Sequence, residues 1–387
     1  MCGNLRSGER DLITRDEKAQ LKKYIRDLKF VPGGRYLYYA GRKNRYYNNC
    51  FLLKAEEDTR EDWANLSWKS ESCLMTGGGI GVDYSVYRQS GRILQGTGGV
   101  ASGPIPKMQM INEIGRRVMQ GGSRRSAIYA SLNWDHGDVN DFLTAKDWDQ
   151  MPVGNTGLTL KQIKEQDFNF PAPLDMTNIS VNYNTDWLLK YWETGDVGEV
   201  FKKNVRQALR TAEPGFSFNF FEDESDTLRN ACTEVVSADD SDVCNLGSIN
   251  LGRIESIKEF SDIVELATKF LICGTLRADL PYAKVYETRE KNRRLGLGIM
   301  GLHEWLIQRG FTYEVTPELH RWLSIYKGVS DKVSKEFADS LSVSRPVANR
   351  AIAPTGSIGI LAGTTTGVEP LFAVAYKRRY LTNGTKW

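Results

Sequence analysis

The stretch that decides the fold is residues 230–251, which read NACTEVVSADDSDVCNLGSINL. Cys232 and Cys244 stand twelve residues apart, and Asn230 and Glu234 lie two residues on either side of the first cysteine. In an extended strand, residues i, i+2 and i+4 point to the same face. The spacing therefore predicts that an amide, a thiol and a carboxylate share one face. There they could act together on a small polar molecule, the carboxylate taking a proton and the amide holding a hydroxyl.

The chemistry of Cys232 stays open at this point, because its thiol could act as a nucleophile or lose a hydrogen atom. A nucleophilic thiolate needs a cation or a histidine beside it, and a neighbouring carboxylate such as Glu234 disfavours it. The chain has three histidines, none of them near Cys232 in the sequence, and contains neither HExxH nor Glu-x-x-His. No metal site is therefore predicted. The plainer alternative is a loop with an incidental buried cysteine.

Length and composition describe an ordinary globular chain. It has 387 residues, of which 41% are hydrophobic and 26% charged, with a net charge of +3. This small charge favours neither nucleic acid nor a membrane surface as partner. The sequence has no run of 18 apolar residues and opens on a polar stretch without a signal core, so we expect a cytoplasmic protein (host cytoplasm if viral). Six cysteines without a CxxC pair predict neither a disulfide framework nor a zinc ribbon.

Strand and helix patterns alternate along the chain, which predicts an α/β fold in one large domain. Helices are expected over 15–29, 59–75, 107–120, 137–148, 196–213, 257–275, 300–309 and 316–341. Residues 36–53 are expected to be extended and to end in NNCFLL, and strands are expected within MTGGGIGVDYSVY and QGGSRRSAIYASL and at MTNISVNYN, FSFNF and SINL. Residues 149–176 are predicted to be an irregular loop or flap. The GxGxxG match at 296–301 follows no apolar strand, so we interpret it as close strand–helix packing rather than as a dinucleotide site.

Six blocks, in order, resemble the catalytic chain of ribonucleotide reductases, in the group that spans the radical-subunit-dependent and adenosylcobalamin-dependent classes. The resemblance runs from about residue 31 to residue 380. The blocks are NCFLL (49–53), QGGSRRSA (120–127), Asn230-x-Cys232-x-Glu234, CNLGSINL (244–251), NRRLGLGIMG (292–301) and PTGSI (354–358).

The resemblance implies a ten-stranded α/β barrel, built of two five-stranded half-barrels around a central finger loop. Residues 1–30 would form a short N-terminal helical segment without an ATP cone, and residues 31–387 the catalytic barrel. Members of the family continue with further barrel elements and a cysteine-bearing tail, so we expect the barrel to be incomplete at its C-terminal end.

The same resemblance implies a role for each site residue. Cys232 would carry a thiyl radical that removes the ribose 3′ hydrogen, Glu234 would take the proton of the 3′-hydroxyl, and Asn230 would bind the sugar hydroxyls. Cys50 and Cys244 would help to expel the 2′-hydroxyl as water and end as a disulfide. Two electrons are needed for this reduction, and a dithiol can supply them.

Substrate and effector contacts follow from two further regions. The PTGSI loop, Pro354, Thr355, Gly356, Ser357 and Ile358, would bind the substrate phosphates through backbone amides at a helix start, although an N-capping turn is the alternative. Asn49 is expected to face the substrate pocket. Asp58, Arg92 in the loop 88–104, and the segment 149–178 occupy the positions of the family's effector site, where a deoxynucleotide or ATP binds at a dimer interface. A plain helix cap is the alternative for Asp58.

The radical source has two candidates, adenosylcobalamin bound by this chain or a separate small metal-containing subunit. We favour adenosylcobalamin, because the block TGGGIGVDYS and the compact form are similar to enzymes of that class. The resemblance further implies a homodimer, a ribonucleotide di- or triphosphate as substrate, and a reductant of the thioredoxin or glutaredoxin type. Two alternative functions remain. The chain could be a catalytically incomplete or regulatory nucleotide-binding protein that resembles a reductase, or it could be a dithiol oxidoreductase. Intact Cys50, Asn230, Cys232, Glu234 and Cys244 speak against a mere binder.

Overall fold

The structure is a computed structural model that describes residues 9–118, 126–220, 226–375, 380–381 and 385–386. Its centre is an eight-stranded sheet with the order β1-β9-β2-β3-β4-β5-β6, in which β10 also pairs with β9. The strands are β1 (Phe30–Pro32), β2 (Cys50–Lys54), β3 (Gly79–Asp83), β4 (Ile128–Asn133), β5 (Thr177–Tyr183), β6 (Gly215–Phe218), β9 (Asp242–Asn250) and β10 (Leu295–Met300). This arrangement confirms the predicted α/β fold.

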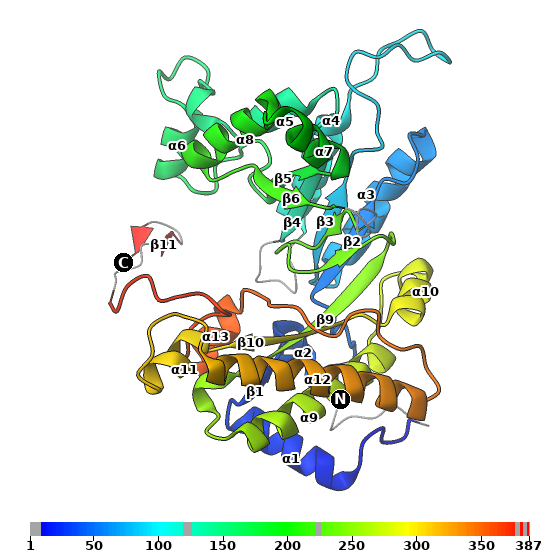
Figure 1. Cartoon of the computed structure of the whole chain (residues 1–387). Coiled ribbons are helices and arrows are strands. Elements are labelled where there is room, and N and C mark those ends of the chain that lie inside the picture. Colours follow the sequence, from blue (N-terminus) through cyan, green and yellow to red (C-terminus); the bar gives the residue numbers. More distant parts are fainter. Residues whose placement is uncertain (1–8, 119–125, 221–225, 376–379, 382–384, 387) are drawn as a thin grey trace.

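The five strands from β2 to β6 run parallel to one another. Parallel neighbours need long crossover connections, and helices supply most of them. In Figure 1 these helices gather around β3 to β6 in the upper part of the molecule. They are α3 (Arg60–Met75), α4 (Pro104–Arg117), α5 (Val139–Thr144), η1 (Trp148–Gln150), α6 (Leu160–Gln166), α7 (Thr185–Thr194) and α8 (Gly198–Thr211). Every residue of β3 is buried, as expected for a strand covered on both faces.

Strand β9 connects this parallel sheet to the rest of the chain. It pairs antiparallel with β2 and β1 and parallel with β10, and all nine of its residues are buried. Figure 1 shows β9 reaching from the upper part of the molecule to the lower part, where the remaining helices lie. They are α1 (Arg15–Arg26), α2 (Gly34–Tyr39), η3 (Leu251–Arg253), α9 (Ile257–Arg277), α10 (Ala283–Asn292), α11 (Leu302–Gln308), α12 (Pro317–Ser340) and α13 (Gly356–Ala362).

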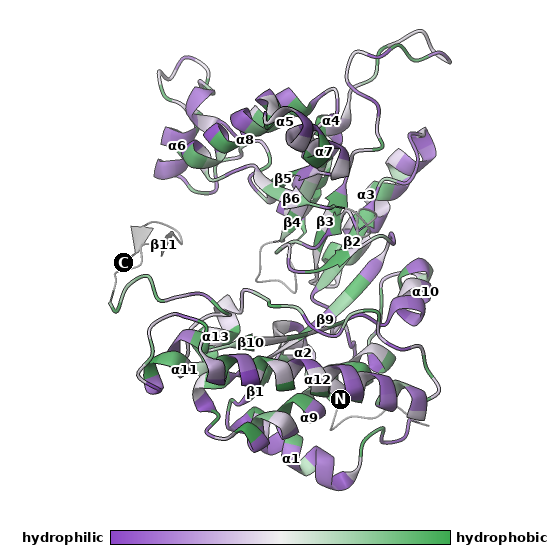
Figure 2. Ribbon diagram, viewed as in Figure 1, coloured by the Kyte–Doolittle hydropathy of each residue, from purple (hydrophilic) through white to green (hydrophobic). Residues whose placement is uncertain are grey.

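Apolar residues concentrate where the helices meet the sheet (Figure 2). The long helices α9 and α12 pack against each other, and α9 also packs on β9. α1 packs against α9, and β1 joins β9, so residues 15–32 contact the same core as the barrel strands. β11 (Tyr380–Leu381) and β12 (Thr385–Lys386) form a separate two-stranded sheet. Within the described ranges, no helix combines the length and the apolar character that crossing a bilayer requires.

A short hairpin lies against β3 and is called the finger hairpin here (residues 228–237). It consists of β7 (Leu228–Arg229) and β8 (Val236–Ser237) joined by a turn. Two glycines of β3 make room for it. A Cβ on Gly81 would lie 1.7 Å from the carbonyl oxygen of Arg229, and one on Gly79 would lie 2.9 Å from the Cβ of Ala231. The sheet can therefore accept the hairpin only because these side chains are absent.

Several predicted elements differ from the observed ones. Residues 36–53 were expected to be extended, but α2 covers Gly34–Tyr39 and the strand begins only at Cys50. Tyr36 and Tyr39, spaced by one helical turn, are both buried, so their burial favours a helix over the strand preference of tyrosine. The predicted irregular segment contains α6, and α7 and α10 were not predicted. Residues 295–300 form β10 itself, and Gly296 and Gly298 make its close contacts with β9 and the segment 351–353 rather than with a helix.

A buried ion pair holds the start of β9 against β2 and α3. Lys69 donates from Nζ to both carboxylate oxygens of Asp240 at 3.1 Å, and the two side chains are 2% and 1% exposed. Asp240 also accepts from the backbone amide of Lys54 at 2.9 Å and from the Ser241 hydroxyl at 2.8 Å. A buried charge is tolerated only when its partners compensate for lost hydration.

We expect Asp240→Asn to lower the free energy of unfolding by about 3 kcal/mol, because it leaves the Lys69 ammonium buried without its main partner. The estimate lies at the lower end of the range for such pairs, since Glu56 remains 3.8 Å from Lys69. Chemical denaturation measures the change. The matched control is Asp239→Asn, which breaks a pair with the exposed Lys291 and should cost less than about 1 kcal/mol. Equal losses of unfolding free energy in the two variants would show that the buried pair of Lys69 with Asp240 stabilises the protein no more than the exposed pair does.

A candidate active site around three cysteines

The tip of the finger hairpin brings Asn230, Cys232 and Glu234 together, but not as the sequence predicts. The backbone of Thr233 is left-handed, with φ at 68°, and its amide donates to the Asn230 carbonyl at 3.0 Å. Residues 230–234 thus form a tight turn, and the predicted extended strand is wrong. Since the tip projects beyond β7 and β8, it satisfies its backbone groups by turning on itself.

The Asn230 side chain connects Glu234 to Cys50, the first residue of β2. Its Nδ2 donates to Glu234 Oε2 at 2.8 Å and to Cys50 Sγ at 3.0 Å, and its Oδ1 accepts from the Val235 amide at 3.0 Å. Both amide hydrogens are therefore used inside the protein. Asn230 is fully buried, and its role here is to hold Glu234 and Cys50 in place. A direct contact between Asn230 and a substrate hydroxyl stays a prediction.

Cys50 and Cys244 lie directly opposite each other on the antiparallel strands β2 and β9. Opposite residues of such a pair share one face with Cα atoms about 4.5–5.5 Å apart, which is within the range that a disulfide spans. Both thiols are buried. Burial raises the pKa of the Cys50 thiol well above its usual value, and the Glu234 carboxylate adds to the rise. Burial also raises the pKa of Cys244, against the opposing effect of Arg294.

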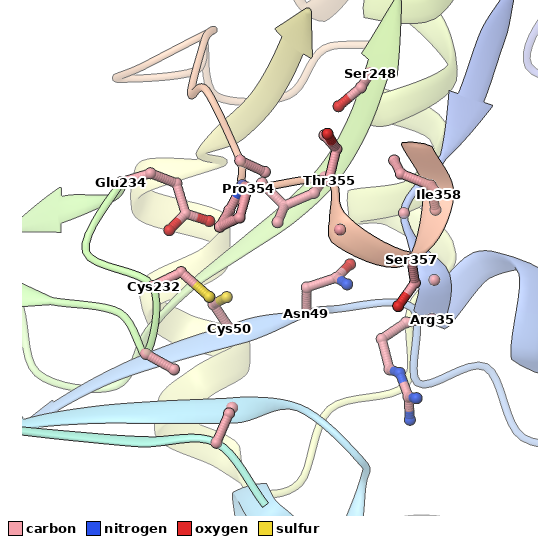
Figure 3. Close-up of a pocket in the computed structure, with 18 of the residues that line it drawn as sticks. Arg35, Asn49, Cys50, Cys232, Glu234, Ser248, Pro354, Thr355, Ser357 and Ile358 are labelled. Atoms are coloured by element: carbon pink, nitrogen blue, oxygen red, sulfur yellow. The ribbon is translucent and has the colours of Figure 1, made fainter. Parts of the chain in front are cut away.

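One cavity of about 240 Å³, open to solvent, collects the predicted catalytic and phosphate-binding residues (Figure 3). Cys232 is exposed at the tip of the finger hairpin. The lining comprises Gly33, Gly34, Arg35, Asn49, Cys50, Gly77, Gly79, Ala127, Ala231, Cys232, Glu234, Leu246, Gly247, Ser248, Ala353, Pro354, Thr355, Gly356, Ser357 and Ile358. Residues from seven separate segments of the sequence thus meet around Cys232 and Cys50.

Two buried acceptors on the cavity wall lack a hydrogen-bond partner within the described part of the chain. They are Glu234 Oε1 and Asn49 Oδ1. An unsatisfied buried polar atom costs roughly 1–3 kcal/mol, so the pair favours a ligand that brings hydrogen-bond donors. Burial raises the pKa of Glu234, and the hydrogen bond from Asn230 partly offsets this. Hydroxyl groups of a sugar are donors of the required kind.

The PTGSI loop forms the wall opposite the finger hairpin. Thr355 has left-handed backbone geometry, with φ at 51°, and α13 starts directly after it at Gly356. The amides of Gly356, Ser357 and Ile358 belong to the first helical turn, where no intrahelical acceptor exists. The Thr355 hydroxyl accepts from the Gly367 amide at 2.7 Å. The structure therefore brings all five residues of the loop into the same cavity as Cys232.

Asp58 and Arg92 lie together in a second cavity, which Arg88 and residues 93–97 also line. Asp58 accepts from Arg88 Nε at 2.5 Å, whereas Thr59 caps α3 by accepting from the Asp62 amide. The interpretation of Asp58 as a helix cap is therefore wrong. The segment 149–178 does not contribute to this cavity within the residues described.

Sequence reasoning missed Arg35 as a lining residue, since VPGGR at 31–35 indicated only a break after the first helix. Ser248 was also missed, although it lies inside the block CNLGSINL. The block 120–127 falls mostly outside the described residues, and of it Ala127 lines the cavity. Among the side chains described, no group of three His, Cys, Asp or Glu is arranged to hold a metal ion.

Comparisons with known proteins identify the family of the chain. The family model described as "Ribonucleotide reductase, barrel domain" matches residues 48–165 and 179–321. The chain is 27% identical to a vitamin B12-dependent ribonucleoside-diphosphate reductase of Thermoplasma acidophilum, over 94% of this chain and 50% of that protein. It is 28% identical to the enzyme of the same name from Mycobacterium tuberculosis (strain CDC 1551), over 92% of this chain and 54% of that protein.

A third relative is the ribonucleoside-diphosphate reductase large subunit of Danio rerio, with 28% identity over 72% of this chain and 40% of that protein. The chain spans about half the length of the curated relatives it matches. Because the family model covers more than half of the sequence, including Cys50, Cys232 and Cys244, the chain belongs to the ribonucleotide reductase family through its barrel domain.

Proposed function

We propose that the chain reduces ribonucleotides to 2′-deoxyribonucleotides by thiyl-radical chemistry, which supplies precursors for DNA synthesis. The observation that carries the proposal is the arrangement of three thiols. Cys50 and Cys244 are register partners in the sheet, and the exposed Cys232 and the carboxylate of Glu234 line the same cavity as Cys50. A reaction that removes a hydroxyl from a carbon needs two electrons, and an adjacent dithiol supplies them.

In the proposed reaction, a radical on Cys232 Sγ removes the hydrogen atom from C3′ of the ribose. Glu234 takes the proton of the 3′-hydroxyl through Oε1, the oxygen without a protein partner within the described residues. The 2′-hydroxyl leaves as water with a proton from the dithiol. Cys50 and Cys244 together give up two protons and two electrons and become a disulfide; one proton leaves in the water, and the other proton with the two electrons forms the new C2′–H bond. Glu234 returns its proton to the 3′-oxygen, and Cys232 returns a hydrogen atom to C3′ and recovers its radical, so atoms and electrons balance.

The raised pKa values of Cys50 and Cys244 support this role. Burial keeps both thiols protonated at neutral pH, so each holds a hydrogen that it can transfer. A hydroxyl leaves more easily as water than as hydroxide, and a protonated thiol can provide the proton. Ordinary nucleophilic catalysis would need the opposite, a thiolate. The same burial argues against a general dithiol oxidoreductase, whose thiols must reach a protein or disulfide substrate.

The substrate would lie with its sugar between Glu234 and Asn49 and its phosphates at Pro354–Ile358. The acceptors on Glu234 and Asn49 that have no partner among the described residues suit sugar hydroxyls. The first-turn amides of α13 suit an anion, as does the hydroxyl of Ser357 beside them. We propose a ribonucleoside diphosphate or triphosphate as substrate, because the sites for hydroxyls and for phosphates line one continuous cavity.

Adenosylcobalamin is the radical source that we favour, with a separate metal-containing subunit as the alternative. Cys232 and Thr233 are exposed at the tip of the finger hairpin, so the thiol can be reached from outside the sheet, and these residues would contact a bound corrin. When bound, the cofactor supplies the oxidising radical by homolysis of its cobalt–carbon bond. Two relatives bear vitamin B12-dependent names, which supports this choice, whereas the large-subunit name of the Danio rerio protein agrees with the alternative.

Regulation and partners complete the proposal. The cavity with Asp58, Arg88 and Arg92 would bind a deoxynucleotide or ATP effector, since it offers two guanidinium groups to phosphates and a carboxylate to ribose or base. A homodimer would form next to this site. A thioredoxin- or glutaredoxin-type protein in the cytoplasm would supply the electrons that restore the buried Cys50 and Cys244 thiols after each turnover, and a cysteine-bearing tail of the kind that family members have would carry them into the cavity. The domain boundary near residue 30 remains a proposal as well.

The proposed reaction can be tested by turnover. Incubation of the protein with a ribonucleotide, a deoxynucleotide effector, excess dithiothreitol and adenosylcobalamin should yield deoxyribonucleotide, and omission of the cofactor should abolish it. Cys232→Ser should lower the rate by more than about 10³-fold, because the radical then has no carrier. The matched control is Cys273→Ala on α9, which lies outside the cavity and should retain the rate.

Chromatographic detection of the deoxyribonucleotide decides between the alternatives. Product from Cys232→Ser would contradict the thiyl mechanism. Product that forms only after addition of a metal-containing partner subunit would favour the other radical source. Thiol–disulfide exchange without any nucleotide, unchanged in Cys232→Ser, would favour a dithiol oxidoreductase.

The proposed role of Glu234 as a base predicts how kcat/KM depends on pH. Glu234 must be ionised to accept a proton, and its pKa is raised by burial, so kcat/KM should fall on the acidic side at a pH above the usual glutamate pKa of 4.5. Glu234→Gln should remove this acidic limb and lower the rate by roughly 10²–10⁴-fold. Asn230→Ala removes a hydrogen bond that lowers the pKa, so it should move the limb to higher pH. A pH profile that is the same in all three proteins would exclude Glu234 as the base.

A further inference from the structure

We infer that Arg35 holds the terminal phosphate of the substrate and so makes the site select nucleoside polyphosphates over nucleosides. The inference rests on the proposed function, because it assigns a further residue to that substrate site. Arg35 follows Gly33 and Gly34 at the start of α2 and lies on the wall of the cavity that contains Cys232. Its side chain is almost completely buried, with 5% of the residue exposed.

The distribution of charge in the cavity carries the argument. Among its described lining residues, Arg35 is the only cation and Glu234 the only carboxylate. Figure 3 draws Glu234 and Cys232 on one side, Arg35 and Ser357 on the other, and Asn49 between them. A molecule with hydroxyls at one end and an anion at the other therefore fits in one orientation. That orientation directs the hydroxyls to Cys232 and the anion to Arg35.

The guanidinium of Arg35 packs against two neighbours, Gly77 and Tyr38. A Cβ on Gly77 would lie 2.0 Å from Arg35 Nη1, so the guanidinium occupies the space that this glycine leaves. Gly77 itself has φ at 89° and lines the cavity too. The guanidinium carbon also lies 5.1 Å from the centre of the Tyr38 ring. A side chain fixed in this way can meet a ligand with little further loss of conformational entropy.

The chemistry of arginine matches the phosphate end of a nucleotide. Its planar fork forms two parallel hydrogen bonds to phosphate oxygens and stays charged at all physiological pH values. The first-turn amides of α13 are neutral donors, so they do not compensate the charge of a diphosphate. Arg35 supplies that charge, and the distant Glu234 repels the phosphates from the reacting end.

The test uses protection of Cys232 from alkylation, because Cys232 lines this cavity and not the one around Asp58. The protein is treated with iodoacetamide at increasing concentrations of ADP or adenosine, and mass spectrometry follows the Cys232 peptide. In the unmodified protein ADP should protect at much lower concentration than adenosine. Arg35→Gln should raise the half-protecting ADP concentration at least about tenfold and leave that of adenosine within about twofold. Arg35→Lys, which keeps the charge but not the fork, should lie between.

Arg42→Gln is the matched control, since Arg42 lies over the same Tyr38 ring at 4.4 Å but is exposed and outside the cavity. It should leave both half-protecting concentrations unchanged. Thermal unfolding verifies that each variant is folded. A measurement on the unmodified protein is independent of folding defects: higher salt should weaken protection by ADP and not by adenosine.

The outcomes separate the two proposals. If ADP and adenosine lose protection equally in Arg35→Gln, or if salt affects both equally, Arg35 has only a structural role and the inference is wrong. If ADP and adenosine both fail to protect Cys232 in the unmodified protein, the proposed substrate site itself is wrong, together with the inference. A selective loss of ADP protection in Arg35→Gln, absent from Arg42→Gln, establishes Arg35 as a phosphate-binding residue.

Discussion

The pairing of β9 with β2 is the constraint on which the rest of the structure depends. β9 joins the parallel strands β2 to β6 to the part of the molecule that contains β1 and β10. Its register sets Cys50 against Cys244. A shift by one residue would turn one of these thiols to the opposite face of the sheet. The ion pair of Lys69 with Asp240, two residues before the strand begins, is placed where it resists such a shift.

The finger hairpin depends on the same register. Ser237 at the end of β8 donates from its hydroxyl to Asp242 Oδ2 at 2.7 Å, and Arg294 donates to the same oxygen at 2.9 Å. The hairpin is therefore attached to the first residue of β9. At its tip, the Asn230 amide fixes Glu234 relative to Cys50. The positions of Glu234, Asn230 and Cys50 relative to one another thus come from a short chain of hydrogen bonds rather than from a rigid strand.

Much of the site could be predicted from the sequence, for identifiable reasons. The spacing of Asn230, Cys232 and Glu234 predicts that they lie together, and they do, although a left-handed Thr233 rather than an extended strand achieves it. Local pattern cannot reveal that turn, because it depends on the contact of the hairpin with Gly79 and Gly81, about 150 residues earlier in the sequence. Family resemblance predicts that Pro354–Ile358 join the site, whereas periodicity alone does not. Arg35 carries no local signal, since its place in the cavity wall depends on the room that the distant Gly77 leaves for its guanidinium.

The two glycines of β3 also affect how inactivating substitutions in this family should be interpreted. Gly79 and Gly81 have no functional group, and they act only through the volume they leave empty. A change of either to an ordinary residue would displace the finger hairpin while every thiol, carboxylate and amide of the site remained present. Such a variant would look intact in a search for missing reactive groups. Its defect is one of shape, so loss of function in this chain is not confined to positions that touch a substrate.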